Sequence, residues 1–193
     1  MKDSDGVILG ENYIPLDKIG IYIPAGTAPL VSTVYMTVLP AKMAGVKKII
    51  LISPPDKQGL INPHILVVAD LLKVDEIYRV GGAQGIAALA YGTKTVPCVD
   101  KIIGPGNVYV SEAKRQVFGM VDIDMIAGPT ELVIIANRYS EPKFIIADLK
   151  AQTEHAGGLA VLITNSKSLA REVKSQCQDN PGFIILTKNI EQA

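Results

Sequence analysis

The sequence predicts an α/β protein in which a doubly wound parallel sheet (Rossmann-like) is followed by a second, incomplete Rossmann-like unit. Three observations predict this class. From residue 20 to 128, short apolar runs alternate with helical patterns and short connections, which is typical of a parallel sheet with helices on both faces. The run KIILI at 48–52 is continuously apolar, as expected for a strand covered on both faces. After residue 128 the alternation resumes but supplies only about three strands, against about 5–6 in a typical sheet.

The composition is that of a globular protein and excludes some classes of partner. The 193 residues are 48% hydrophobic and 20% charged, and Lys plus Arg equals Asp plus Glu at 19 each. The lack of a basic run argues against nucleic acid. No apolar run approaches the ~18 residues needed to span a bilayer, so no membrane partner is expected and the predicted location is cytoplasmic. Cys98 and Cys177 form no metal-like pair, and a disulfide is not expected in a reducing compartment.

The first unit is expected to span residues 20–128, after an extended lead-in over residues 1–19 in which 12–16 are candidates for an edge strand. Its strands are predicted at 20–23, 48–52, 76–80, 101–103 and 121–126. A helix over 30–44 follows from apolar residues at three-to-four spacing, with a kink at Pro40 and an end at Gly45. A helix from about residue 63 follows from the stripe Ile65, Val68, Ala69 and Leu72. Helices are also predicted at 83–91 and from 108.

The second unit is expected to span residues 129–193. The predicted order is strand 132–136, helix 140–155 ended by Gly157 and Gly158, strand 160–164, helix 166–177 and strand 183–187, with a new helix starting at Asn189. This is about half of a doubly wound domain.

Four glycine-containing turns are candidate ligand sites, because ligands of open parallel sheets bind beyond the carboxyl ends of the strands. They lie at 24–26, 81–84, 104–107 and 128–131. In the segment 101–115 a strand, a tight turn and a helix follow one another, and such a turn offers free backbone N–H groups to a phosphate or carboxylate. The same residues are also consistent with an ordinary turn in which Asn107 caps the helix. None of the turns is a GxGxxG fingerprint or a P-loop.

A second candidate site lies in DLKAQTEH at 148–155. On a helix, Asp148, Gln152 and His155 share one face, and the opposite side, with residues 145, 146 and 149, faces the sheet. An oxygen ligand and an imidazole one turn apart can hold a divalent metal. The other interpretation is a solvated helix end with His155 near the negative end of the dipole. Four further residues are predicted to be exposed on helix surfaces: Lys42, His64, Lys114 and Arg115.

Five segments together resemble the histidinol dehydrogenase family, over nearly all of residues 10–175: GIYIPAGTAPLVSTVYMTVLPAKMAGVKKIILISPP, VGGAQGIAALAYGT, VDKIIGPGNVYVSEAKRQV, IDMIAGPTELVIIA and DLKAQTEHAGG. The resemblance implies oxidation of L-histidinol to L-histidine by a homodimer that uses NAD and zinc. It implies NAD contacts at Tyr22, Gln84 and Asn107. It further implies substrate contacts at Thr130 (where the family usually has serine), Gln152 and His155, the last two also being zinc ligands.

The departures from the family pattern bear on activity. The family chain is more than twice as long, and its Glu-His acid/base pair and two further zinc ligands lie outside the matched segments. The only Glu-His pair here, Glu154-His155, belongs to the zinc motif, so no catalytic residue is retained. The 193 residues alone are expected to be inactive, with an incomplete zinc site. A non-catalytic dinucleotide-binding or oligomerisation remnant, with a second copy or a complementing chain as partner, is the alternative. An aldehyde-dehydrogenase-like enzyme is disfavoured because neither cysteine lies in a convincing nucleophile site.

Overall fold

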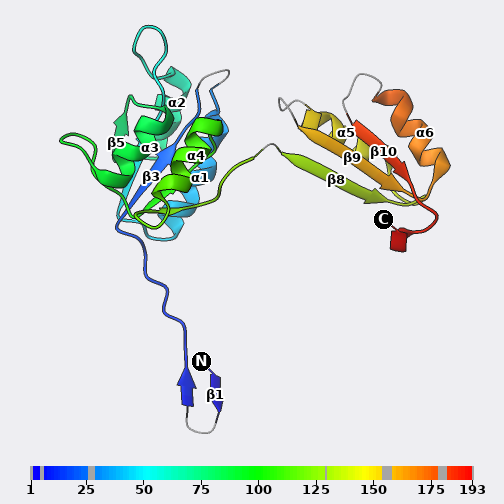
Figure 1. Ribbon diagram of the computed structural model, residues 1–193, viewed down its shortest axis with the longest axis horizontal. Coiled ribbons are helices and arrows are strands. Elements are labelled where there is room, and N and C mark those ends of the chain that lie inside the picture. Colours follow the sequence, from blue (N-terminus) through cyan, green and yellow to red (C-terminus); the bar gives the residue numbers. More distant parts are fainter. Residues whose placement is uncertain are drawn as a thin grey trace. The chain divides into compact units, whose positions relative to one another are not determined.

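The computed structural model describes residues 2–4, 7–25, 29–128, 130–153, 158–177 and 182–192, apart from the side chains of 2–9 and 190 (Figure 1). The chain divides into two compact units, residues 1–127 and 128–193. Unit 1 has a five-stranded sheet with two hydrophobic cores and a separate two-stranded pair, and unit 2 has a three-stranded sheet with one core.

Unit 1 is built on a five-stranded parallel sheet in the order β5-β4-β3-β6-β7. The strands are β3 (Lys18–Tyr22), β4 (Lys48–Ile52), β5 (Glu76–Tyr78), β6 (Lys101–Ile103) and β7 (Asp122–Ile123). The chain runs outward from β3 to β5 and then returns to β6 on the other side of β3. The sheet is therefore doubly wound, with its switch point between β3 and β6, which confirms the predicted fold class.

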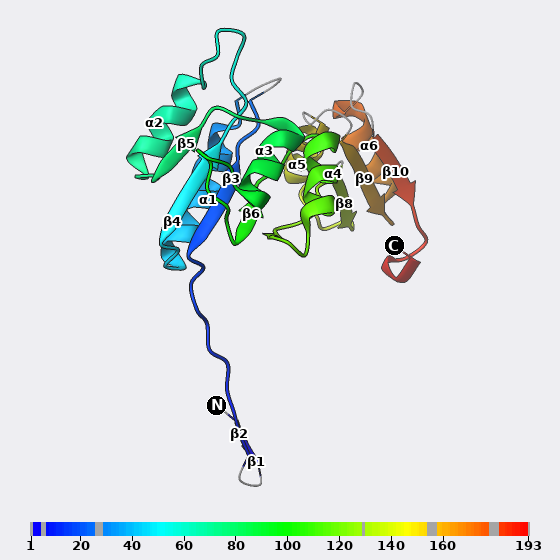
Figure 2. The ribbon, with the colours of Figure 1, turned by 60° about the vertical axis from the view of Figure 1, so that its left-hand side comes forward.

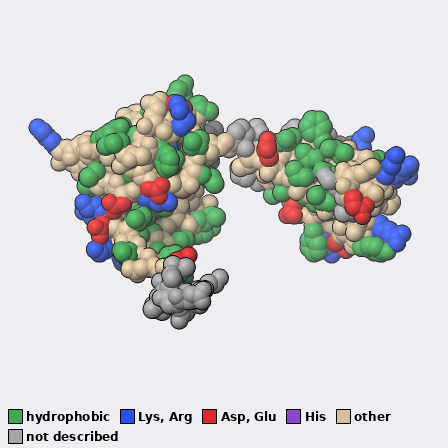
Figure 3. Space-filling model, turned by 60° about the horizontal axis from the view of Figure 1, so that its bottom comes forward, with side chains coloured by type: hydrophobic (Ala, Val, Ile, Leu, Met, Phe, Trp, Pro, Cys, Tyr) green, Lys and Arg blue, Asp and Glu red, His purple; other side chains and the backbone are tan. Residues whose placement is uncertain are grey.

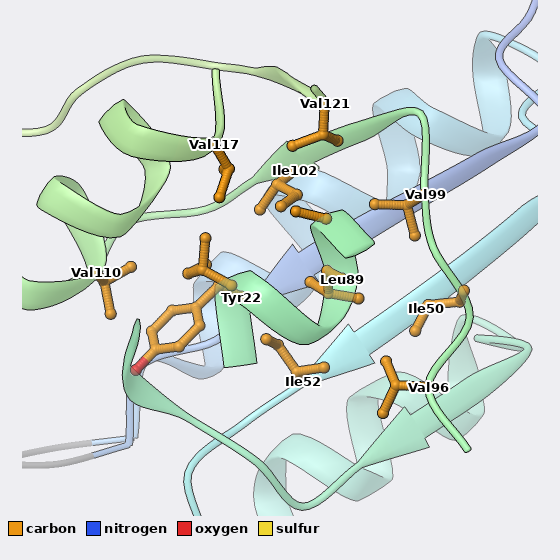
Figure 4. Close-up of a cluster of buried hydrophobic side chains, with 12 residues drawn as sticks. Tyr22, Ile50, Ile52, Leu89, Val96, Val99, Ile102, Val110, Val117 and Val121 are labelled. Atoms are coloured by element: carbon orange, nitrogen blue, oxygen red, sulfur yellow. The ribbon is translucent and has the colours of Figure 1, made fainter. Parts of the chain in front are cut away.

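Helices cover both faces of this sheet. The helices are α1 (Val31–Met43), α2 (Pro63–Leu71), α3 (Gly82–Tyr91) and α4 (Val108–Val117). One core contains Val34 and Val38 of α1 with Ile65 of α2. The other contains Leu89 of α3 and Val110 of α4 (Figure 4). Figure 2 shows α3 and α4 side by side. Because β4 is buried between both cores, its continuous apolar run is explained.

Four predicted strands of unit 1 differ in the structure, and the first of them, predicted at 20–23, spans Lys18–Tyr22. The segment 12–16 forms no strand, and Pro15 within it lacks the N–H that a sheet ladder needs. Instead β1 (Lys2–Ser4) and β2 (Val7–Leu9) pair antiparallel. Strand β5 is two residues shorter than expected and ends at Tyr78. Strand β7 stops at Ile123 rather than at residue 126, because the next residue, Asp124, uses its carboxylate to bond other parts of the unit.

Unit 2 is a three-stranded parallel sheet in the order β10-β9-β8. Its elements are β8 (Glu131–Ala136), α5 (Pro142–Thr153), β9 (Leu159–Thr164), α6 (Lys167–Gln176) and β10 (Gly182–Leu186). Ile145, Ile146 and Leu149 of α5 are buried against the sheet, as predicted. The helix expected from Asn189 is a single 3-10 turn, η1 (Ile190–Gln192). The predicted stop at Gly157 lies outside the described residues.

The sheet of unit 2 is covered on one face by the described helices α5 and α6. Side chains alternate along a strand, so the other residues point to the opposite face. That face, called the open face below, consists of two cross-strand rows: Val133, Val161 and Phe183, and Ile135, Ile163 and Ile185. Four of the six side chains are 46–64% exposed. Hydrophobic side chains also reach the surface elsewhere on both units (Figure 3).

Two ion pairs across the sheet of unit 1 make stability depend on pH. Lys48 at 2.5 Å and the Tyr78 hydroxyl at 2.8 Å hydrogen-bond the Glu76 carboxylate and hold its pKa below 4.5. Lys101 at 2.8 Å likewise holds the pKa of Asp122 below 3.8. Since the carboxyls have their ordinary pKa in the unfolded chain, this stabilisation is complete above pH 4.5 and is lost as the pH falls through the lowered values. We expect the thermal midpoint to fall on acidification, and to fall less steeply in Glu76→Gln.

The control for this pH experiment is Glu141→Gln, which removes an exposed carboxylate that forms no ion pair in the described part of the chain. Thermal midpoints by circular dichroism from pH 7 downward would make the comparison. Equal pH slopes for Glu76→Gln and the parent chain would contradict the expectation.

Candidate functional site

The candidate site of unit 1 lies at the switch point, where the carboxyl ends of β3 and β6 are neighbours. Gly104 follows β6 with φ +113°, and a Cβ built on it would lie 2.2 Å from the backbone oxygen of Tyr22. Only glycine permits both this backbone conformation and this approach. The two strands therefore end closely side by side, with the turn at 104–107 leading away from that point.

Tyr22 connects the end of β3 to the start of α3. Its side chain is buried, and its hydroxyl oxygen accepts a hydrogen bond of 3.3 Å from the backbone N–H of Gly82. Figure 4 shows the ring among the apolar side chains and the hydroxyl oxygen at the margin of the group. Because the hydroxyl acts as acceptor in this contact, its own hydrogen is available for donation.

The start of α3 is built from glycines that fit against neighbouring elements. Gly81 is the N-cap without a side-chain bond, and a Cβ there would lie 2.5 Å from Cβ of Pro54. Gln84, in the first turn, is exposed, and its amide oxygen would be 2.9 Å from a Cβ on Gly82. The Gly82 N–H bonds the Tyr22 hydroxyl, and within the described part of the chain no side chain accepts from the next N–H groups of the first turn. The positive end of the α3 dipole thus lies at the carboxyl edge of the sheet, as it does where helices bind anions.

The start of α4 is closed by its own side chain. The Oδ1 atom of Asn107 accepts hydrogen bonds from the backbone N–H groups of Tyr109 and Val110, both at 3.1 Å. This confirms the predicted N-cap and uses the amide oxygen of Asn107. The amide nitrogen Nδ2 is a donor outside the cap, so a ligand meeting Asn107 finds a hydrogen-bond donor.

Lys114 contradicts the prediction that it lies on a solvated helix face. The side chain is 1% exposed, its Nζ donates a hydrogen bond of 3.0 Å to the Gly104 oxygen, and it forms an ion pair with Asp124. The other carboxylate oxygen of Asp124 accepts 2.8 Å from the Gly104 N–H. The sequence signal for this burial is spacing: Lys114 is four residues after Val110 and three before Val117, both buried, so it belongs to the apolar stripe of α4.

The other three residues predicted to be exposed behave as expected. His64 is exposed in the first turn of α2, with its Nδ1 3.1 Å from Oδ1 of Asn62. Lys42 and Arg115 are exposed as well. Cys98 and Cys177 are free thiols in the described part of the chain.

The candidate site of unit 2 joins the last turn of α5 to the residue before β8. Nε2 of Gln152 donates to the backbone oxygen of Thr130 at 2.7 Å and lies 3.1 Å from its hydroxyl. A carbonyl oxygen can only accept, so the contacting amide atom must be the nitrogen, and the Gln152 oxygen is left for another partner. The turn at 128–131 leads into the amino end of β8 and does not follow the carboxyl end of β7 as predicted, because β7 already stops at Ile123.

The metal motif is only partly described. Gln152 and the exposed Asp148 lie on α5, whereas His155 lies outside the described residues. Among the residues with described placement, no group of three or more His, Cys, Asp and Glu side chains could hold a metal ion. The described donors therefore fit a metal only in part, through the amide oxygen of Gln152. No helix in the described part of the chain is long and apolar enough to cross a membrane.

A doubly wound sheet with glycine turns at its carboxyl edge defines the class: a Rossmann-like α/β protein whose switch point is the candidate ligand site. The family model for histidinol dehydrogenase matches residues 1–191. The chain belongs to the histidinol dehydrogenase family, which consists of oxidoreductases of histidine biosynthesis.

Relatives agree with this membership. The chain is 55% identical over 194 residues to histidinol dehydrogenase of Listeria monocytogenes serovar 1/2a, covering 98% of this chain and 45% of the relative. It is 55% identical over 177 residues to that of Bacillus cereus strain ATCC 14579, covering 91% and 41%. The crystal structure of histidinol dehydrogenase from Elizabethkingia anophelis matches with a TM-score of 0.85 at 41% identity, covering 92% of this chain and 45% of that one. The chain thus spans less than half the length of these relatives.

Proposed function

We propose that this chain carries the NAD-binding part and a portion of the substrate and zinc site of a histidinol dehydrogenase, which oxidises L-histidinol to L-histidine. The observation that carries the proposal is the carboxyl edge of unit 1. There Tyr22, Gln84 and Asn107, the residues assigned to NAD by the family resemblance, stand at the ends of β3, β5 and β6. In this arrangement one extended ligand can meet three strand ends across the switch point.

The available hydrogen-bond groups suit a dinucleotide. At the start of α3 the N-cap Gly81 has no side chain, and the Gly82 N–H already bonds Tyr22. The N–H groups that follow in the first turn and the positive dipole end are offered to a phosphate. Tyr22 offers its hydroxyl hydrogen, and Asn107 offers Nδ2, because their oxygen atoms already accept bonds from backbone N–H groups. NAD would supply the hydride acceptor, whereas the protein groups named here bind and orient.

The zinc and substrate roles fall on Thr130, Gln152 and His155. The bond between Gln152 and Thr130 fixes the amide so that its oxygen is the atom free to serve as a ligand. Zinc sites normally have three or four protein ligands, and this chain supplies two by the family motif. We therefore expect weak metal binding by the 193 residues alone. Because a positioned general base contributes typically about 10²–10⁴-fold and no Glu-His pair besides Glu154-His155 exists here, we expect no measurable turnover by this chain alone.

The experiment that tests the dinucleotide site is calorimetric titration of NAD into the purified chain and into Asn107→Ala. The substitution removes one ligand donor, which is expected to weaken binding about tenfold. It also removes a helix cap, which costs about 1 kcal/mol of stability. Asn62→Ala is the matched control, since Asn62 caps α2 in the same way, through the His64 N–H at 3.0 Å. Absence of NAD binding by the parent chain, or equal weakening in both variants, would count against the proposal.

A second candidate function is a non-catalytic module that associates with another copy of itself. The open face of unit 2 favours it, because Val133, Ile135 and Phe183 are each more than half exposed in contiguous rows. Contiguous apolar surface of this kind marks an interaction site. Within the proposed function the same association accounts for a homodimer, and the proposed location is the cytoplasm.

A further inference from the structure

The ion pair between the buried Lys114 and the partly exposed Asp124 involves none of the residues assigned to NAD, substrate or zinc. Lys114 is 1% exposed, although it carries an ammonium group, and the Asp124 side chain is 30% exposed. Burying charges is costly, and apolar residues of similar volume often replace a buried ion pair without loss of stability. A contribution to the free energy of unfolding therefore does not explain why positions 114 and 124 carry charged residues.

The contacts that Lys114 and Asp124 make with Gly104 explain why these two residues are charged. Gly104 is buried, and both of its backbone polar groups are bonded by the pair: the oxygen by Lys114 at 3.0 Å and the N–H by Asp124 at 2.8 Å. At φ +113° Gly104 has left the strand conformation, and a buried polar group without a partner is strongly unfavourable. Asp124 also accepts 2.7 Å from the Met125 N–H, which fixes its own orientation.

The pair also ties both ends of the turn together. Lys114 lies two helical turns beyond Asn107, so its bond to Gly104 links the body of α4 back to the residue where the turn begins. Asn107 stands where the turn ends and caps α4. The turn at 104–107 is therefore fixed at its start by Lys114 and Asp124 and at its end by the cap.

We propose that Lys114 and Asp124 are positioning residues of the dinucleotide site: they hold the turn at 104–107 so that Nδ2 of Asn107 faces the ligand. This inference rests on the proposed NAD site and adds to it two residues that do not touch the ligand. It predicts that loss of the pair weakens NAD binding even where the fold is kept.

The test compares Lys114→Met and the double variant Lys114→Met/Asp124→Leu with the parent chain. The double variant leaves no charge without its partner, but the N–H and the oxygen of Gly104 lose theirs. Its thermal midpoint is therefore expected to fall, and the affinities are compared at a temperature well below the midpoints of all variants. The NAD affinity of the double variant, by calorimetry, is expected to fall about tenfold, because one ligand bond is misplaced. Arg115→Met is the matched control: it removes the next cation on α4, which is exposed and paired with Glu112, and should change the affinity less than about twofold.

Amide hydrogen exchange measures the local stability of the turn at 104–107 without any need for NAD binding. The double variant is expected to exchange faster at Gly104, Tyr109 and Val110, whose N–H groups bond Asp124 and Asn107, while the later amides of α4 keep their protection. A double variant with unchanged NAD affinity and unchanged exchange at these three amides would overturn the proposal. If the parent chain fails to bind NAD, the proposed function fails, and the exchange data alone decide whether the pair holds the turn.

Discussion

Gly104→Ala is expected to destabilise unit 1 by at least about 3 kcal/mol, the range of severe single substitutions. Two effects add up at this residue. The φ of +113° is unfavourable for any residue with a Cβ. The added Cβ would also lie 2.2 Å from the Tyr22 oxygen. Tyr22 belongs to the central strand and is buried between α3 and α4 on that face, so its backbone cannot move without disturbing the core.

Gly119→Ala separates these two effects. Gly119 has φ +99°, but a Cβ built there has no heavy atom within 4 Å. The control therefore carries the backbone strain without the close contact, which is expected to cost about 1–2 kcal/mol. Urea unfolding of both variants measures the difference, and equal losses would show that the approach of β6 to β3 is not the cause.

Replacement of the open face is expected to change the oligomeric state. We expect this face to pair with another copy of the chain in a purified sample, so that the parent sediments at about twice its monomer mass at micromolar concentration. In Val133→Thr/Ile135→Thr/Phe183→Thr the exposed apolar groups become polar, whereas the β-propensity of the strands is kept. This variant is expected to be monomeric.

Val67→Thr/Leu71→Gln is the control for the oligomer experiment. These α2 residues are 59% and 71% exposed, as apolar as the open face but in unit 1. A parent chain that is monomeric at all concentrations, or a control that dissociates as the open-face variant does, would contradict the expectation.

The parts of the fold that depend on local patterns could be predicted from the sequence. The KIILI run is buried on both faces, and Asn107 caps α4 because an Asn before a helix needs only its own neighbours for that bond. Strand β7 is shorter than its apolar run suggested, because Asp124 bonds Gly104, twenty residues earlier in the chain. Such a contact depends on the folded sheet and leaves no local signal.

The candidate site was predictable in part for the same reason. The glycine turns and the residues of the family motifs can be identified in the sequence, whereas the hydrogen bonds between them cannot. The bond between Tyr22 and Gly82 joins residues sixty apart, and the burial of Lys114 depends on Asp124 arriving from the next strand. The position of Lys114 in an apolar helix stripe indicates burial, but its partner Asp124 is known only from the fold.

The cap on α4 has a consequence for the charge of the ligand that the turn at 104–107 could accept. Aspartate would cap this helix about as well as Asn107 does, because both offer the same side-chain oxygen. It would, however, bring a negative charge to the proposed dinucleotide site, where it would repel a phosphate. With its oxygen bonded to the N–H groups of Tyr109 and Val110, the amide presents only its NH₂ group outward. The choice of the neutral residue at this one position thus gives the turn a preference for anions that the helix cap alone would not require.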